Sequence, residues 1–152
     1  MLRIRPFEWR EPTTVEEVVS LLLQYKDKAY LCSGGSDLMP NLKLWQLDAE
    51  VIISVRRLPN SDSVHLTENT VQIGGMVSLH KISQNPIVLK YFPVLIEAVK
   101  KIASPQIRRQ GTLVGNLLIK SRCRYINQSE LFRQALGGCL RSHGKECHVI
   151  PG

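Results

Sequence analysis

Aliphatic residues recur at helical spacing near the start of the chain. They fall on one face of a helix: Val15, Val18, Val19, Leu22 and Leu23. Just before them, Thr14-Val-Glu-Glu17 follows Pro12 and has the sequence of a capping box, which satisfies the first free N–H groups of a helix. The spacing therefore predicts an amphipathic helix over residues 14–26.

Short apolar runs bounded by polar turns predict several strands. Ala29–Cys32 leads directly into the pair Gly34-Gly35, and Glu50–Val55 is a continuous apolar run typical of a buried strand. Ile4–Trp9 alternates weakly between apolar and polar residues and is a further short candidate. Residues 63–66 and 70–73 predict the two strands of a hairpin.

Further helical segments are predicted at residues 38–44, 78–83, 91–103 and 127–136. The segment 91–103 carries Leu95, Ile96, Val99 and Ile102 on one face, and we expect Pro105 to end it. Small strands mixed with helices, some joined by crossover connections, predict an α+β or α/β fold.

Composition limits the class of protein. A length of 152 residues, with 43% hydrophobic and 22% charged residues, is typical of one globular domain. No apolar run approaches the about 20 residues that a membrane span requires, and charges near the N-terminus exclude a signal peptide. We therefore expect a cytoplasmic protein with reduced thiols and no membrane partner.

The net charge of +7 is concentrated in the last third of the chain. Residues 100–152 hold ten Lys and Arg residues against only Glu130 and Glu146. A basic end of this kind suits an anionic cofactor, an acidic partner or nucleic acid. Nucleic acid is not expected, because no binding motif is present and no aromatic residues are interleaved with the basic ones.

Two glycine-bearing segments have features of anion or ligand sites. In Leu31–Leu38, Gly34-Gly35 follows a predicted strand, so that successive N–H groups can converge on a phosphate, with Ser33 and Ser36 as further donors. In Gly111–Asn116, Thr112 and Asn116 can hydrogen-bond a polar ligand. Plain turns are the alternative interpretation of both segments, and Ile73-Gly74-Gly75 is best interpreted as the exit of the hairpin.

Three cysteines follow in a basic, loop-rich segment: Cys123, Cys139 and Cys147. Grouped thiols in a chain without an export signal favour a metal or cluster over disulfides. One alternative is a zinc-stabilised, non-enzymatic binding module, with His143 or His148 as a fourth ligand. Another is a non-functional truncated remnant with free thiols.

Together, the glycine segments resemble those of the FAD-binding subunit of the molybdenum hydroxylases, the family that includes xanthine dehydrogenase and carbon monoxide dehydrogenase. Residues 32–38 are similar to the family's Ala-Gly-Gly-Thr-Asp-Leu pattern, and Ile73–Gly75 to its Ile-Gly-Ala strand end. Arg109–Leu117 is similar to its Arg-Asn-x-Gly-Thr-x-Gly-Gly-Asn-Leu loop, with two departures. Gln110 replaces Asn, and Val114 replaces the first Gly of the pair.

The resemblance implies a truncated α+β FAD-binding domain of the PCMH (vanillyl-alcohol oxidase-like) type, with small mixed sheets and flanking helices. It implies a flavin subdomain at residues 1–55 and the start of a second at residues 56–152. The implied FAD-binding residues are Ser33, Gly34, Gly35, Ser36, Asp37, Leu38, Gly111, Thr112, Gly115 and Asn116. Because a β-branched residue tolerates positive φ poorly, we expect Val114 to hinder the approach of the flavin.

The cysteine segment is similar to an insertion in the β subunit of 4-hydroxybenzoyl-CoA reductase that holds a [4Fe–4S] cluster. The resemblance assigns Cys123, Cys139 and Cys147, in an insertion at residues 121–152, as three ligands of such a cluster. The fourth ligand would lie beyond Gly152, so we expect the chain to be an N-terminal fragment. Cys32 belongs to the flavin loop and is not a ligand in this interpretation.

The resemblance also implies a function. The chain would be an FAD-binding electron-transfer subunit of a flavin-dependent oxidoreductase, with no catalytic residue of its own. Its partners would be a molybdenum-cofactor subunit, a [2Fe–2S] subunit and a small redox carrier such as ferredoxin or NAD.

Overall fold

The N-terminal part of the chain is built on three short parallel strands. A computed structural model describes residues 3–120 and 122–150. The strands are β1 (Glu8–Arg10), β2 (Ala29–Cys32) and β3 (Val51–Ser54), in the order β1-β3-β2. Val51 of the central strand lies opposite both Glu8 and Ala29. All four residues of β3 are buried, as expected for a parallel strand covered on both faces.

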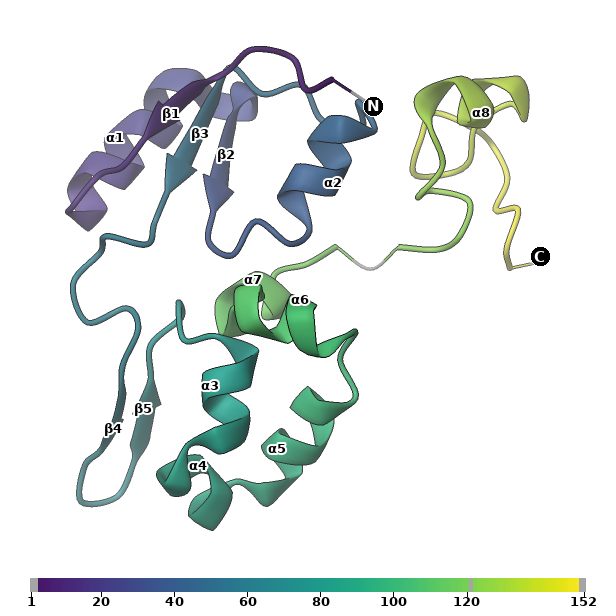
Figure 1. Cartoon of the computed structure of the whole chain (residues 1–152). Helices are drawn as coiled ribbons and strands as arrows, with labels where there is room; N and C mark the ends of the chain where they lie inside the picture. Colours follow the sequence, from purple (N-terminus) through teal and green to yellow (C-terminus); the bar gives the residue numbers. More distant parts are fainter. Residues whose placement is uncertain (1–2, 121, 151–152) are drawn as a thin grey trace.

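Helices cover both faces of this sheet (Figure 1). On one side is α1 (Val15–Tyr25), whose Val18 packs with Val51 and Ile53. On the other is α2 (Leu38–Lys43), whose Leu42 packs with Ile52. The alternation of side chains along β3 therefore divides its apolar residues between two small cores. Thr14 caps α1 in the predicted capping box, and a single 3₁₀ turn, η1 (Lys26–Lys28), leads into β2.

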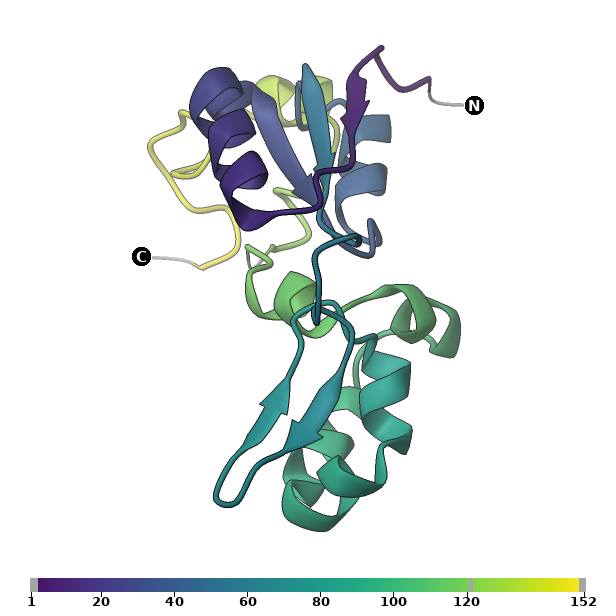
Figure 2. The ribbon, with the colours of Figure 1, turned by 90° about the vertical axis from the view of Figure 1, so that its left-hand side faces the viewer.

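The second part is a hairpin packed on helices. The hairpin consists of β4 (Val64–Leu66) and β5 (Val71–Ile73), paired antiparallel. The helices are α3 (Leu79–Gln84), α4 (Pro86–Tyr91), α5 (Pro93–Lys100), α6 (Pro105–Gln110) and α7 (Leu113–Leu117). Figures 1 and 2 show α6 and α7 at the junction with the N-terminal part.

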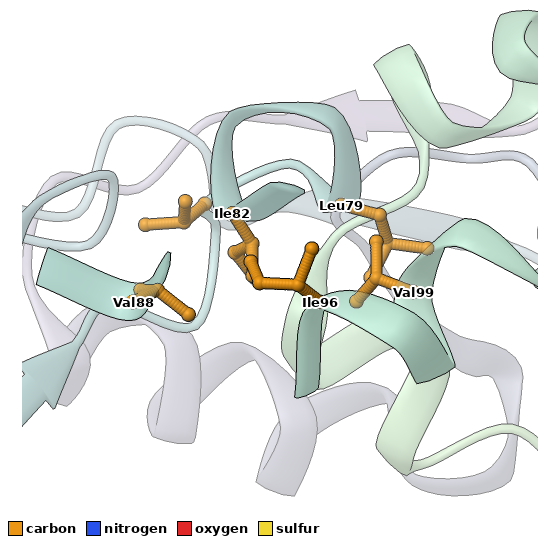
Figure 3. Close-up of a cluster of buried hydrophobic side chains, with 6 residues drawn as sticks. Leu79, Ile82, Val88, Ile96 and Val99 are labelled. Carbon is orange, nitrogen blue, oxygen red and sulfur yellow. The ribbon is translucent and has the colours of Figure 1, made fainter. Parts of the chain in front are cut away.

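The core of this second part joins α3, α4 and α5 (Figure 3). Six buried side chains contact one another: Val77, Leu79, Ile82, Val88, Ile96 and Val99. Partly buried Val64 and Ile73 bring the hairpin against the same cluster. The second part therefore has an apolar core separate from the two that flank the first sheet.

The structure corrects two predictions in this region. The predicted helix 91–103 corresponds to α5 alone and is shorter than expected. The helix before it, α4, was not predicted, and the two meet at Phe92. Each begins with a proline, and Asn85 caps the first by accepting hydrogen bonds from the N–H groups of Ile87 and Val88. Pro105 does not end a helix but begins α6, because a missing N–H costs nothing at a first helical position. The glycine-bearing segment after α6 contains the short helix α7.

The C-terminal segment, residues 118–150, contains one helix, α8 (Glu130–Ala135), on the side of α2. The side-chain amide of Gln46 donates to the carbonyls of Asn127 and Gln128, both at 3.0 Å. The predicted helices at 14–26, 38–44 and 78–83, the buried strand and the hairpin are all confirmed within a residue or two. No helix in the described ranges has the length and apolarity needed to cross a membrane.

Candidate functional site

Two of the glycine segments, 76 residues or more apart in the chain, are in direct contact. A Cβ atom on Gly34 would lie only 2.0 Å from the carbonyl oxygen of Gln110, so the two backbones approach as closely as glycine alone permits. The hydroxyls of Ser33 and Thr112 form a hydrogen bond with each other. The segment 31–38 therefore packs directly against residues 110–112.

The segment after β5 completes the junction. The N–H of Leu79 donates to the carbonyl of Gly111 at 2.9 Å, and the N–H of Leu113 donates to the carbonyl of Val77 at 3.0 Å. These bonds flank an isolated bridge between Ser78 and Thr112. All three glycine segments singled out in the sequence thus meet at one place, although they belong to different parts of the fold.

A row of backbone N–H groups without a described acceptor lies at this junction. Across the described residues, none of the N–H groups from Ser33 to Asp37 donates to a protein acceptor. All five residues are partly exposed, so the groups are accessible to a ligand. Gly35 holds a positive φ of 72°, the left-handed conformation that turns consecutive N–H groups toward one point. Such an arrangement binds anions, phosphate above all.

The segment 111–116 supplies polar side chains next to the N–H groups of residues 33–37. Thr112 is buried, and its Oγ1 accepts from the N–H of Gly115 at 3.2 Å, which caps α7. The side-chain amide of Asn116 has no partner among the residues that the structure describes, so it is free to bind a ligand. Leu38 has a different place, because its side chain packs in the core with Cys32 and Leu42.

The side chain of Asp37 is held by a polar network that the sequence did not reveal. Its carboxylate accepts from Nη2 of Arg122 at 3.1 Å and from the amide of buried Asn41 at 3.0 Å. Arg122 also donates to Asn41 and, at 3.1 Å, to Gln46. The network ties the C-terminal segment to the end of the first glycine segment.

The sequence analysis also missed Arg56, a cation next to the first glycine segment. Nε of Arg56 donates to the carbonyl of Ser33 at 2.8 Å, which places a positive charge beside the free N–H groups. The pKa of the Cys32 thiol is raised by burial, and the charge of Arg56 partly opposes this. Arg56 follows the buried strand β3, and the carboxyl edge of a parallel sheet is where ligands bind in many α/β proteins. The place of Arg56 directly after a predicted buried strand was the sequence signal by which it could have been found.

Val114 lacks the backbone strain expected of it. The expected backbone strain is absent, because Val114 is not one of the described residues with positive φ. It lies in the first turn of α7 and packs against Gly75. The expected strain at Val114 is therefore absent, and hindrance of the flavin by its side chain stays a prediction.

The three C-terminal cysteines lie in separate turns. The thiol of Cys123 accepts from the N–H of Ile126, and that of Cys147 from the N–H of Ile150, both at 3.4 Å. Cys139 is buried, and the hydroxyl of Ser142 donates to its sulfur, which lowers the pKa of that thiol. All four cysteines are free.

No metal site is assembled from these side chains. Within the described ranges, no three side chains of His, Cys, Asp or Glu gather closely enough to hold a metal ion. His148, a candidate zinc ligand, instead contacts the ring of Tyr125 and the carbonyl oxygen of Gly138. The residues as placed do not fit the [4Fe–4S] cluster predicted at Cys123, Cys139 and Cys147, nor the alternative zinc site.

Comparison with known proteins gives consistent matches. Residues 5–138 match the family described as FAD binding domain in molybdopterin dehydrogenase. The chain is 38% identical over 111 residues to the carbon monoxide dehydrogenase medium chain of Hydrogenophaga pseudoflava, covering 73% of this chain and 39% of that one. It is 33% identical over 119 residues to the nicotinate dehydrogenase FAD-subunit of Eubacterium barkeri, covering 78% and 40%.

A solved structure of carbon monoxide dehydrogenase from Hydrogenophaga pseudoflava superimposes with a TM-score of 0.73 and 36% identity over 76% of this chain and 40% of that chain. This match confirms the α+β fold expected from the sequence. The chain spans about 40% of the length of these relatives. The expected particular closeness to 4-hydroxybenzoyl-CoA reductase finds no support among them.

Proposed function

This chain belongs to the FAD-binding domain family of the molybdopterin dehydrogenases, and on that premise we propose that it binds FAD within the electron-transfer subunit of a molybdenum-containing oxidoreductase. One observation carries the proposal for this chain itself. The segments 33–38 and 111–116 meet in space, and the first presents five consecutive N–H groups with no protein acceptor in the described structure.

Each part of the site has a role in holding the cofactor. The N–H groups of residues 33–37 would bind the pyrophosphate, assisted by the hydroxyl of Ser36 and the charge of Arg56. Gly111 lies beside Ser36, and a Cβ there would lie 3.1 Å from the carbonyl oxygen of Ile107, so the absence of a side chain suits this close packing. Thr112 and Asn116 would position the part of the cofactor beyond the pyrophosphate, and Gly115 would let it approach the start of α7.

The chain's own contribution is to bind and orient the cofactor. Bound FAD would exchange two electrons with one redox partner and single electrons with another. No side chain of this site is assigned an acid–base or nucleophilic role. Asp37, the acidic residue of the loop, is already engaged by Arg122 and Asn41, so it acts as a structural brace.

The partners follow from the family and belong to the proposal. A molybdenum-cofactor subunit would carry out the substrate chemistry, and a [2Fe–2S] subunit would connect it to the flavin. A small carrier such as ferredoxin or NAD would exchange electrons with the complex in the cytoplasm. The division into subdomains at residues 1–55 and 56–152 stays part of the proposal. The separate core of α3, α4 and α5 supports it, although Leu58 and Met76 pack against a core of the first part. A cluster at the three cysteines is not included, because the described structure does not gather them.

The test is a titration of the purified chain with FAD, followed by quenching of flavin fluorescence. Ser36→Glu places a negative charge beside the proposed pyrophosphate position, and Ser36→Gln has the same size without the charge. We expect Ser36→Glu to bind FAD about tenfold more weakly than Ser36→Gln, because like charges repel. Absence of FAD binding by the unmodified chain, or equal affinity of the two variants at equal stability, would contradict the proposal.

A further inference from the structure

A large cavity lies between the turn that follows α2 and the C-terminal segment. Its volume is about 820 Å³, within the roughly 300–1,000 Å³ of small-molecule sites. Residues 45–47 form one wall, and residues between 120 and 143 form the rest. None of the residues 33–38 or 111–116 lines it, so it is separate from the glycine segments.

The lining of this cavity is strongly basic. Five of its side chains are cationic or can become so: Lys120, Arg122, Arg133, Arg141 and His143. The single acidic residue in the lining is Glu130, which accepts from the side chain of Gln134 at 3.1 Å. Lys120 makes no ion pair in the described part of the chain. Arg133 likewise makes no ion pair with the residues described, so Lys120 and Arg133 give the cavity positive charge that no described carboxylate neutralises.

Two of the cations are fixed in place. Arg133 donates to the backbone carbonyl of Ile126 at 3.2 Å and also to that of Gln128, so its orientation is set without neutralising its charge. Arg122 is held by its contacts with Asp37, Asn41 and Gln46. Cations that are already ordered bind an anion with a smaller loss of side-chain entropy.

Two non-glycine residues of the lining have left-handed backbones. Trp45 has φ 54° and His143 has φ 65°. The indole N–H of Trp45 donates to the carbonyl of Arg3 at 2.9 Å, which fixes the ring at the cavity wall. Such conformations are costly for residues with side chains, and they concentrate at functional sites.

We propose that this cavity binds a phosphorylated organic anion of nucleotide size. The cations supply the contacts for phosphate, for which Arg is especially suited by its planar, multiply donating group. Trp45, Leu47 and Ile126 supply apolar surface next to them for the organic part. Arg122 is shared with the network that holds Asp37, whereas the other cations and Trp45 have no role in the site proposed for FAD.

Gly137 provides a sharp test, because it lines the cavity and a Cβ there would meet nothing within 4 Å. Its φ is 83°, a conformation that Asn and Asp tolerate better than other residues. Gly137→Asp and Gly137→Asn thus share the same backbone cost and size and differ only in charge. Binding of ADP and of inorganic pyrophosphate is measured by calorimetry for both variants and for the unmodified chain.

We expect ADP to bind about tenfold more weakly to Gly137→Asp than to Gly137→Asn, because one added negative charge repels a multiply charged anion. ADP should bind more tightly than pyrophosphate, since the apolar wall contacts its organic part. Lys120→Gln should weaken binding, and Lys100→Gln, which removes the same charge from α5, should not. Ser36→Glu should leave this binding unchanged, even if it abolishes binding of FAD.

Equal affinity of the two Gly137 variants would overturn the proposal. So would an ADP site that Ser36→Glu removes, because the anion would then bind at the glycine segments. Pyrophosphate binding as tightly as ADP would overturn the assignment of an organic ligand. FAD binding is measured separately, so the two failures are distinguishable. If only this proposal fails, FAD still discriminates between the Ser36 variants; if only the flavin site fails, ADP still discriminates between the Gly137 variants.

Discussion

The side chain of Val114 occupies the space that a side chain at position 75 would need. A Cβ on Gly75 would lie 2.6 Å from Cγ2 of Val114, far inside van der Waals contact. The two residues are also joined through the backbone, where the N–H of Val114 donates to the carbonyl of Gly75 at 3.0 Å. Both positions depart from the family pattern, which has Ala at the first and Gly at the second. The departures offset each other in volume.

This relationship predicts non-additive substitutions. Gly75→Ala alone should lower the free energy of unfolding by about 1–3 kcal/mol, the usual cost of overpacking. In a Val114→Ala background the same change should cost less than half as much, because the clashing methyl group is gone. Chemical denaturation of the four proteins in this cycle measures the coupling. Additive effects would show that the two side-chain volumes are independent.

Arg122 should control how firmly the C-terminal segment is attached. Arg122→Lys keeps the charge but cannot reach Asp37, Asn41 and Gln46 at once. We expect faster hydrogen exchange and faster proteolysis across residues 122–150, with a loss of about 1 kcal/mol in the free energy of unfolding. Arg124→Lys, at an exposed position of the same segment, is the control and should change neither. Identical exchange in the two variants would contradict this role.

Thr112 should be sensitive to loss of its hydroxyl. Thr112→Val removes the cap of α7 and leaves the Ser33 hydroxyl without this partner, so we expect a loss of about 1–2 kcal/mol in the free energy of unfolding. Thr112→Ser retains both bonds and should recover most of it. Thr67→Val, which breaks a comparable hydroxyl pair with Thr70 at the exposed end of the hairpin, should cost less. Urea denaturation ranks the three variants.

The thiol of Cys139 should ionise at lower pH than an ordinary cysteine, because the Ser142 hydroxyl stabilises its thiolate. As pH rises, the pH at which Cys139 reaches half its maximal alkylation rate should come before that of Cys32, whose pKa is raised by burial. Ser142→Ala should shift the Cys139 midpoint upward. Mass spectrometry of the alkylated peptides separates the two sites. An unchanged midpoint in Ser142→Ala would exclude this hydrogen bond as the cause.

The described cysteines should not hold a metal in this chain. Because the described part gathers no three suitable ligands, anaerobically purified protein should contain iron and zinc well below one equivalent. Elemental analysis and assay of acid-labile sulfide measure this, with Cys139→Ala as the control for a bound cluster. Stoichiometric iron with sulfide that disappears in Cys139→Ala would restore the predicted cluster.

Local patterns predicted most of the elements correctly. The capping box at Thr14 and the aliphatic face behind it specify α1, since both operate over a few residues of the same segment. The helices α4 and α6 were missed for a local reason as well. A proline can follow the end of one helix or occupy the first position of the next. Its place in the sequence alone therefore does not distinguish the end of a helix from the start of one.

The sequence by itself determined which residues were candidates for the proposed flavin site, because glycines after strands and hydroxyls beside them are local requirements for binding an anion. It did not determine how those segments meet. The contact of Gly34 with Gln110, the bond between Ser33 and Thr112 and the fit of Val114 on Gly75 join residues that are 39 or more positions apart. The tertiary structure alone decided them, along with the roles of Arg56 and Arg122. Such contacts depend on how several cores pack together, and no spacing within one segment records that packing.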